Sequence, residues 1–143
     1  MKLIIALFLI IFSLNAQSTK DKNYGSAEVS EVISIYDGDT FRVNLKNYPD
    51  IVGYHIPIRI NGIDTPELRA KCQKEKLLAR KAKQVTVEAV RGAKSIKLSN
   101  MKRGKYFRIL ADVEADNINL ADLLLKKGLA VPYDGGTKTD WCK

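Results

Sequence analysis

Apolar and polar residues alternate along the first half of the chain in the manner of β-strands. Residues 41–45 and 56–60 carry an apolar side chain at every second position, and residues 28–35 are rich in valine and isoleucine. A period of two predicts half-buried strands over these three ranges. In the third strand the isoleucines share one face, so Arg59 falls on the opposite face. Residues 47–55 contain proline and glycine and are expected to form a loop.

Residues 71–90 change to the periodicity of an amphipathic helix. Apolar residues recur there at intervals of three and four positions, and lysine and arginine fill the other side. The expected apolar stripe consists of Leu78, Ala82, Val85 and Ala89. Arg91 and Gly92 follow and are expected to end the helix, because glycine is common at helix C-termini.

The second half of the chain predicts two further strands, over residues 95–99 and 106–114. In the second of these, Phe107 and Ile109 fall on one face and Arg108 falls on the other. Both strands follow the long helix, so they are expected to complete the sheet that the first three strands begin.

Residues 116–117 are a turn signal, and residues 120–127 have the pattern of a short helix that Gly128 is expected to stop. Residues 129–133 are expected to be extended. The resulting order is three strands, a helix, two strands and a helix. This order is compatible with a small five-stranded Greek-key barrel, although periodicity alone does not distinguish that topology from several others.

The chain has 143 residues and begins with a lysine and an unbroken apolar run over residues 3–12, followed by small and polar residues. This pattern describes a secretory signal peptide, and the run is half of the roughly 20 residues that a spanning helix needs. We expect residues 1–16 to be a signal peptide, residues 17–25 a polar linker and residues 26–143 a single domain. Cleavage after Ala16 would give an exported protein, secreted or periplasmic, with no membrane span. A retained anchor is the alternative.

Positive charge is concentrated in the middle of the chain. The formal net charge is +8, and between Arg69 and Arg108 there are 14 lysine or arginine residues against two acidic ones, a local balance of +12. A basic block beside carboxylates suits a polyanionic partner, and nucleic acid is the class that we expect. The alternative is a solvated helix face.

The two cysteines are Cys72 and Cys142. In an exported protein two cysteines pair more often than they stay free, so we expect a disulfide that ties the C-terminal tail to the start of the long helix. Two free thiols are the alternative. The cysteines are too few and too far apart to indicate a zinc site.

Three carboxylates and two arginines stand near the ends of the predicted strands. Asp39 belongs to the segment Asp-Gly-Asp-Thr, and Asp64 and Glu67 belong to Ile-Asp-Thr-Pro-Glu. Carboxylate and carbonyl oxygens are ligands of hard cations such as Ca²⁺. The planar guanidinium groups of Arg59 and Arg108 match phosphate oxygens. A cation, a carboxylate and two arginines are what phosphodiester hydrolysis requires.

These segments, in this order, resemble the staphylococcal nuclease family. The resemblance covers about Glu28 to Tyr133 and rests on Asp-Gly-Asp-Thr, Arg-Ile-Asn-Gly-Ile-Asp-Thr-Pro-Glu, Lys-Tyr-Phe-Arg and Gly-Leu-Ala-Val-Pro-Tyr. It implies an α+β fold, namely an OB-fold five-stranded Greek-key barrel with a long helix after the third strand and a short helix after the fifth.

The resemblance also implies a metal site and a base. It implies that Asp39, Asp64 and the backbone carbonyl of Thr65 bind Ca²⁺ and that Glu67 is the general base. Asp37 is interpreted as a structural residue that supports its turn. Taken alone, the two metal-site aspartates would be turn residues, and Glu67 would be a helix-start residue favoured by the macrodipole.

The remaining implied site residues contact the substrate. Arg59 and Arg108 are expected to be catalytic residues that hold the scissile phosphate, and outward strand arginines are the alternative. Lys105, Tyr106 and Tyr133 match family positions around the bound nucleotide. Lysine can neutralise a terminal phosphate and tyrosine can stack on a base, although tyrosines at a barrel mouth are often packing residues.

We therefore expect an exported, Ca²⁺-dependent nuclease that hydrolyses DNA and RNA with little sequence specificity and, by the resemblance, leaves 3′-phosphates. The alternative is a non-catalytic OB-fold module that binds nucleic acid. A third possibility is a basic exported protein that binds acidic polymers, which would not account for the two carboxylate segments. Nothing in the sequence implies a stable protein partner, so we expect a monomer.

The chain departs from the family pattern at several places. The stretch after Glu67 is shorter and the loop before Arg59 is longer. The chain ends soon after Tyr133 without the third C-terminal helix, for which the expected disulfide would substitute. Phe107 stands where the family often has glycine, and we expect it to tighten the strand near Arg108.

Overall fold

The computed structural model describes residues 22–143, so the predicted signal peptide and the first part of the predicted linker lie outside the described residues. The strands are β1 (Ala27–Ile35), β2 (Thr40–Leu45), β3 (Ile56–Ile60), β4 (Ile63–Asp64), β5 (Ile96–Arg103), β6 (Ile109–Ala115), β7 (Ile118–Asn119) and β8 (Val131–Pro132). The helices are α1 (Asp50–Gly53), α2 (Gln73–Gly92) and α3 (Leu120–Lys126).

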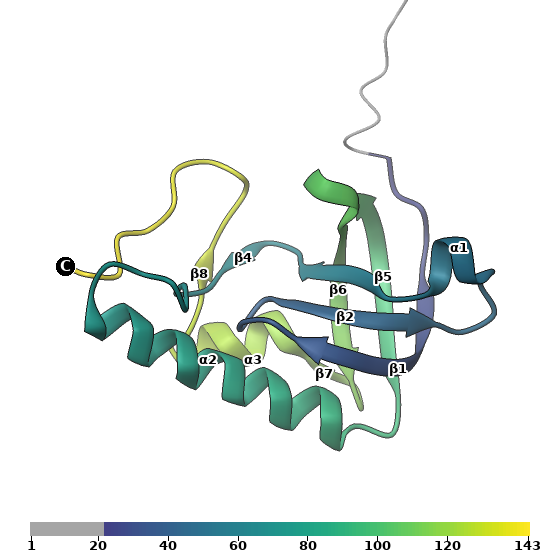
Figure 1. The fold of residues 1–143 in the computed structure, drawn as a ribbon, viewed down its shortest axis with the longest axis horizontal. Helices are drawn as coiled ribbons and strands as arrows, with labels where there is room; N and C mark the ends of the chain where they lie inside the picture. The colour runs from purple at the N-terminus through teal and green to yellow at the C-terminus, as the bar shows by residue number, and fades with distance from the viewer. Residues whose placement is uncertain (1–21) are drawn as a thin grey trace, which may run out of the picture.

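The sheet closes on itself into a barrel. Its strands lie in the order β3-β2-β1-β5-β6-β7, and a further pairing joins β3 to β6. That closing pair is parallel, with Ile58 beside Ile109 and Ile60 beside Ala111, whereas the other pairs of this sheet are antiparallel. Figure 1 shows α2 and α3 packed together below the barrel. The predicted α+β OB-fold, a five-stranded barrel with packed helices, is confirmed.

The core fills the barrel with the apolar side chains that the strand pattern predicts. Its largest side chains, each less than 2% exposed, are Phe41, Val43, Ile58, Ile60, Ile63, Leu98, Val113, Leu120 and Leu124. These side chains come from β2, β3, β4, β5, β6 and α3, so a single core joins the sheet to the C-terminal helix. Burial of this kind is the main stabilising term for a domain of this size.

Helix α2 begins and ends close to the predicted positions, but its buried face is rotated from the predicted stripe. The buried residues are Ala79, Ala82, Thr86 and Val90. The predicted stripe residues Leu78, Val85 and Ala89 are only partly buried. Small side chains let the helix approach the β1–β2 turn closely, since a Cβ on Gly38 would lie 2.7 Å from Ala82 Cβ. The larger apolar residues therefore flank the contact instead of forming it.

The predicted strand over residues 106–114 is wrong at its start, because β6 begins at Ile109. β5 extends to Arg103, which pairs with Ile109, so the chain must reverse within the few residues between them. It does so through left-handed backbone at Tyr106 and Phe107, with φ of 58° and 59°. Phe107 is 87% exposed, so it lies on a turn and does not tighten a strand.

The two short helices α1 and α3 differ in how well the sequence predicts them. Residues 47–55, predicted as a loop, contain the one-turn helix α1. Helix α3 begins after Asn119, whose side chain accepts a hydrogen bond from Asp122 N–H at 3.0 Å. It ends before Gly128, which has φ of 66° and is the predicted stop.

The C-terminal tail returns across the end of the barrel to helix α2. β8 pairs with β4, with Asp64 opposite Val131, and the chain then loops back so that its end lies at the start of α2 (Figure 1). Cys72 and Cys142 form a disulfide there, which confirms the expected pairing. Among residues 22–143, no helix has the length and apolar character that crossing a membrane requires.

Candidate active site

The β1–β2 turn carries Asp39 to the end of the barrel. Tyr36 N–H donates to the Thr40 carbonyl at 2.9 Å and closes the turn. Asp39 N–H donates to Asp37 Oδ1 at 3.2 Å, so Asp37 supports the turn as predicted. Partial burial, followed by the neighbouring charge of Asp39, raises the pKa of Asp37 to about 7.

Helix α2 holds this turn from the other side. Thr86 Oγ1 donates to the Gly38 carbonyl at 2.6 Å in a fully buried contact. A side chain at Gly38 would collide with Ala82 Cβ and lie 3.0 Å from Thr65 Cγ2. Glycine is therefore required for this close approach, and the segment Asp-Gly-Asp-Thr is positioned by the helix as well as by its own strand.

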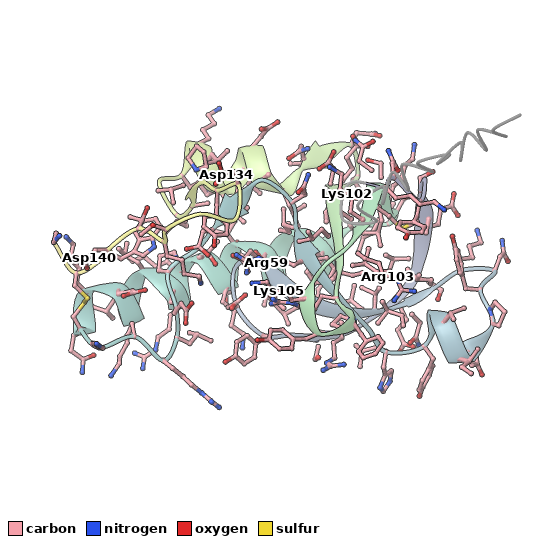
Figure 2. The ribbon with its side chains drawn as sticks, turned by 90° about the horizontal axis from the view of Figure 1, so that it is seen from above. Arg59, Lys102, Arg103, Lys105, Asp134 and Asp140 are labelled. Carbon is pink, nitrogen blue, oxygen red and sulfur yellow. A yellow bond between two sulfur atoms is a disulfide. The ribbon has the colours of Figure 1, made fainter. Side chains whose placement is uncertain are left out.

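Asp39 and Asp64 converge on a single guanidinium group. Arg59 Nη1 lies 2.7 Å from Asp39 Oδ1, and Arg59 Nη2 lies 2.9 Å from Asp64 Oδ1. The carboxylates are 1% and 2% exposed as residues, and the Arg59 side chain is 14% exposed. In Figure 2, Arg59 lies at the end of the barrel that faces the tail. Buried carboxylates need such a partner, because an unpaired buried charge is strongly destabilising.

Thr65 and Glu67 follow Asp64 on the same segment. Thr65 N–H donates to Asp39 Oδ2 at 3.0 Å, which joins the two carboxylate segments directly. The Glu67 side chain is 54% exposed, and its backbone N–H donates to Glu75 Oε1 on α2 at 3.0 Å. Glu67 therefore stands at the rim of the site with its carboxylate accessible to solvent.

Lys138, from the tail, is the site residue that sequence reasoning missed. Its ammonium lies 3.2 Å from Asp64 Oδ1 and forms a close ion pair with Glu67. Partial burial alone would lower the pKa of Lys138, but the carboxylates of Glu67 and Asp64 outweigh it and raise the pKa. The cysteine pair is the sequence signal that could have indicated this residue. Pairing of Cys142 with Cys72 brings the tail back to the start of α2, and Lys138 lies four positions before Cys142.

Arg108 and its neighbours line a groove beside the carboxylates. Arg108 N–H donates to the Lys105 carbonyl at 3.2 Å, and the guanidinium lies 5.8 Å from the centre of the Tyr106 ring. Tyr106 is 83% exposed. Arg108, Tyr106, Thr40 and Arg42 line one groove of about 380 Å³, and the Thr40 hydroxyl donates to Asp39 Oδ1 at 2.8 Å. Thr40 therefore lines the groove and also contacts the Asp39 carboxylate.

The other two predicted substrate residues, Lys105 and Tyr133, come from the β5–β6 turn and from the tail. Lys105 is exposed on the β5–β6 turn, at the same end of the barrel as Arg59 in the view of Figure 2. Tyr133 is half-buried at the start of the tail. Its backbone N–H donates to the Gly62 carbonyl at 2.9 Å and its hydroxyl donates to the Gly136 carbonyl at 3.0 Å. Tyr133 therefore also helps to shape the tail.

The oxygen atoms around Asp39 and Asp64 fit a hard cation. Within residues 22–143, no group donates a hydrogen bond to Asp64 Oδ2, and Thr65 Oγ1 is buried without a hydrogen-bond partner. Buried polar atoms are normally satisfied, so the Thr65 hydroxyl leaves one buried oxygen available to a ligand next to Asp64. An all-oxygen set with two carboxylates suits Ca²⁺ or Mg²⁺ and does not suit soft metals.

A family model described as "Staphylococcal nuclease homologue" matches residues 57–140, which is more than half of the chain. The chain belongs to the staphylococcal nuclease family. No curated protein compared with the chain matches it. The matched range contains Arg59, Asp64, Glu67, Arg108 and Lys138 and begins after the Asp-Gly-Asp-Thr turn.

Membership of the staphylococcal nuclease family indicates a nuclease-like hydrolase that acts on nucleic acid. Members of the family are typically metal-dependent, which agrees with the oxygen set described above.

Proposed function

We propose that this protein is a Ca²⁺-dependent endonuclease that hydrolyses DNA and RNA with little sequence specificity and leaves 3′-phosphate ends. The observation that supports this most is the convergence of Asp39, from the β1–β2 turn, and Asp64, from β4, on one guanidinium, with Glu67 at the rim. Membership of the staphylococcal nuclease family gives independent support.

Asp39, Asp64 and the backbone carbonyl of Thr65 would hold the Ca²⁺ ion. When bound, Ca²⁺ supplies positive charge that stabilises the phosphate oxygens as negative charge grows on them. With the carboxylates engaged in this way, the guanidinium of Arg59 is available to a phosphate oxygen, and Arg108 approaches from the adjoining groove. Two guanidinium groups would then hold the scissile phosphate by charge-assisted hydrogen bonds.

Glu67 would act as the general base. Its accessible carboxylate takes a proton from a water molecule, whose oxygen forms a bond to phosphorus while the bond from phosphorus to the 5′ oxygen breaks. The departing 5′ oxygen takes up a proton from solvent, and the phosphate stays on the 3′ side. His55 is the only histidine of the chain. It lies between α1 and β3 and takes no part in this scheme.

The groove lined by Arg108 and Tyr106 would receive the nucleotide next to the scissile bond. A tyrosine ring accepts any base by stacking, which is worth about 1–3 kcal/mol per base and depends little on sequence. Within the groove and its rim, Arg42, Lys105 and Arg108 supply charge for the backbone. Recognition by stacking and charge explains why little sequence preference is expected.

The deciding experiment is digestion of single-stranded DNA, duplex DNA and RNA by residues 17–143. Each substrate is incubated with millimolar Ca²⁺, with Mg²⁺ and with a chelator. Glu67→Gln is the informative variant, since this side chain is half-exposed and its removal leaves no buried charge. Glu88→Gln, an exposed residue elsewhere on α2, is the matched control. Arg59 variants are less informative because they would also leave the buried Asp39 carboxylate without a charged partner.

We expect cutting that requires Ca²⁺, that falls by about 10²- to 10⁴-fold in Glu67→Gln and that is unchanged in Glu88→Gln. The products should resist extension by a polymerase until a phosphatase removes the 3′-phosphate. Binding without cutting under every metal would instead identify a non-catalytic OB-fold module. Cutting that survives in Glu67→Gln would exclude this residue as the base.

We also propose that the protein is exported to a secreted or periplasmic location. The apolar segment before residue 17 and the disulfide both support this, because disulfides persist in oxidising compartments. Mass spectrometry of the protein from its native cells tests it. An N-terminus at Gln17 in the exported fraction is expected, and a chain that keeps residues 1–16 in the membrane fraction would support a retained anchor.

A further inference from the structure

The ammonium group of Lys138 pairs with two carboxylates of the candidate site. It contacts Asp64 Oδ1 at 3.2 Å and also pairs with Glu67. Asp64 is a proposed metal ligand and Glu67 is the proposed base, so one side chain from the tail bridges both parts of the catalytic machinery. Asp64 is 2% exposed, and the Lys138 side chain is 47% exposed. The ammonium therefore enters the site from solvent.

The tail that carries Lys138 is fixed at both ends. On one side, β8 pairs with β4 so that Val131 lies opposite Asp64. On the other side, Cys142 is bonded to Cys72 at the start of α2. Within the tail, Gly136 N–H donates to Asp134 Oδ1 at 3.1 Å. A segment pinned in this way presents its lysine at a high effective concentration, which a free tail would not do.

The contacts of Lys138 conflict with a bound cation. Asp64 Oδ1 already accepts a hydrogen bond from Arg59, and the ammonium of Lys138 shares that same oxygen. A divalent ion on Asp64 would stand within a few ångströms of the ammonium, and like charges at that distance repel strongly in a partly buried site. Lys138 must then leave Asp64, and its tether keeps it beside the site, where a phosphate oxygen of the substrate competes with Glu67 for the ammonium.

Building on the proposed nuclease function, we propose that Lys138 is a further substrate-binding residue that exchanges partners. Without a cation it neutralises Asp64 and Glu67. When the cation occupies Asp64, the ammonium transfers to a phosphate oxygen of the nucleic acid. The exchange frees the carboxylate of Glu67 for its role as base at the same moment, so cation binding and phosphate binding become coupled through one side chain.

The test measures binding, using the disulfide-bonded chain of residues 17–143 as wild type and as Lys138→Met, Lys138→Arg and Lys126→Met. Lys126 is an exposed lysine at the end of α3 and serves as the matched control. Trp141 is the only tryptophan and lies in the tail, so its fluorescence follows the tail during Ca²⁺ titration, and calorimetry gives the affinity. The second ligand is a phosphorothioate-linked thymidine tetranucleotide, titrated with and without Ca²⁺.

We expect Lys138→Met to bind Ca²⁺ about three- to tenfold more tightly than wild type, because a competing ion pair of this kind is removed. In the presence of Ca²⁺ it should bind the tetranucleotide several-fold more weakly. Lys138→Arg keeps the positive charge, so it should bind both ligands much as wild type does. Lys126→Met should bind both ligands with wild-type affinity. A residue that only anchors the tail would lower stability in Lys138→Met without tightening Ca²⁺ binding.

Unchanged or weaker Ca²⁺ binding in Lys138→Met would overturn the exchange, as would unchanged tetranucleotide affinity. The result is separable from the proposed function. If wild type does not cut but the two affinities shift as expected, the nuclease proposal fails and the exchange stands. If wild type cuts and Lys138→Met binds both ligands as wild type does, only the exchange fails. Absence of Ca²⁺ binding in every variant would overturn both.

Discussion

The buried hydrogen bond from Thr86 to the Gly38 carbonyl allows a direct test of how α2 positions the candidate site. Thr86→Val keeps the shape of the side chain and removes its hydroxyl donor. The Gly38 carbonyl, which accepts a hydrogen bond from Thr86 Oγ1 at 2.6 Å in the wild type, is then left buried without a partner. An unsatisfied buried group of this kind destabilises by about 1–3 kcal/mol. Because Asp39 follows Gly38 directly, the change should also loosen the carboxylate and weaken Ca²⁺ binding and cutting.

Thr86→Ser is the control, because it keeps the hydroxyl and removes one methyl group from a fully buried position. We expect Thr86→Ser to lose about 1 kcal/mol of unfolding free energy and to bind Ca²⁺ with an affinity close to that of wild type. Urea unfolding followed by circular dichroism gives the free energies, and each kcal/mol corresponds to roughly 3–6 °C in a thermal melt. The reasoning is refuted if Thr86→Val unfolds within about 0.5 kcal/mol of wild type, or if Thr86→Ser weakens Ca²⁺ binding as much as Thr86→Val does.

Three further predictions concern the rest of the fold. Phe107→Gly should be more stable than Phe107→Ala by roughly 1 kcal/mol in urea unfolding, because only glycine relieves the left-handed strain at φ of 59°; equal stabilities would show that the turn is unstrained. Backbone N–H groups of Lys94 and Ser95 lower the pKa of Asp116. Its stabilising effect is therefore present above about pH 3.8 and lost as pH falls through its lower folded pKa. The stability difference between wild type and Asp116→Asn should accordingly shrink on acidification, and a difference that is constant with pH would contradict this. Reduction of the disulfide, which spans a sequence separation of 70 residues, should lower the free energy of unfolding by about 2–4 kcal/mol, and an unchanged urea midpoint under reducing conditions would count against that contribution.

Most of the barrel was predictable from the sequence because one face of each strand is buried. In β3 the alternation of isoleucine with polar residues fixes which face turns inward, and Ile58 and Ile60 are indeed less than 2% exposed. A slip of one residue would reverse that face, so the pattern carries real information. The stop of α3 at Gly128 and the turn at 116–117 were predictable for the same kind of local reason, since each depends on residues that tolerate left-handed backbone.

The errors arose where tertiary contacts override local preference. Tyr106 and Phe107 favour strands by their aromatic character, but pairing of Arg103 with Ile109 forces a reversal at that point. The stripe on α2 was displaced for a related reason. The helix must approach the β1–β2 turn, and the closest contact selects Ala82 and Thr86 over larger neighbours. Neither requirement is visible in the periodicity of the segment itself.

Within the candidate site, the sequence predicted the acidic residues but did not predict that Arg59 and Lys138 pair with them. Asp39, Asp64 and Glu67 lie in segments whose residue types point to a cation site. Lys138 lies 71 positions after Glu67 in a tail without periodicity, so the pairing of β8 with β4 and the disulfide place it. Sequence reasoning assigned Arg59 to the phosphate, whereas in the structure its guanidinium binds both buried aspartates.

This difference has a physical origin in the energetics of the folded chain. Two carboxylates buried at the end of a barrel would repel each other and destabilise the fold unless positive charge met them. Arg59 and Lys138 supply that charge from the barrel and from the tail. The chain can therefore fold with both buried carboxylates neutralised by its own side chains.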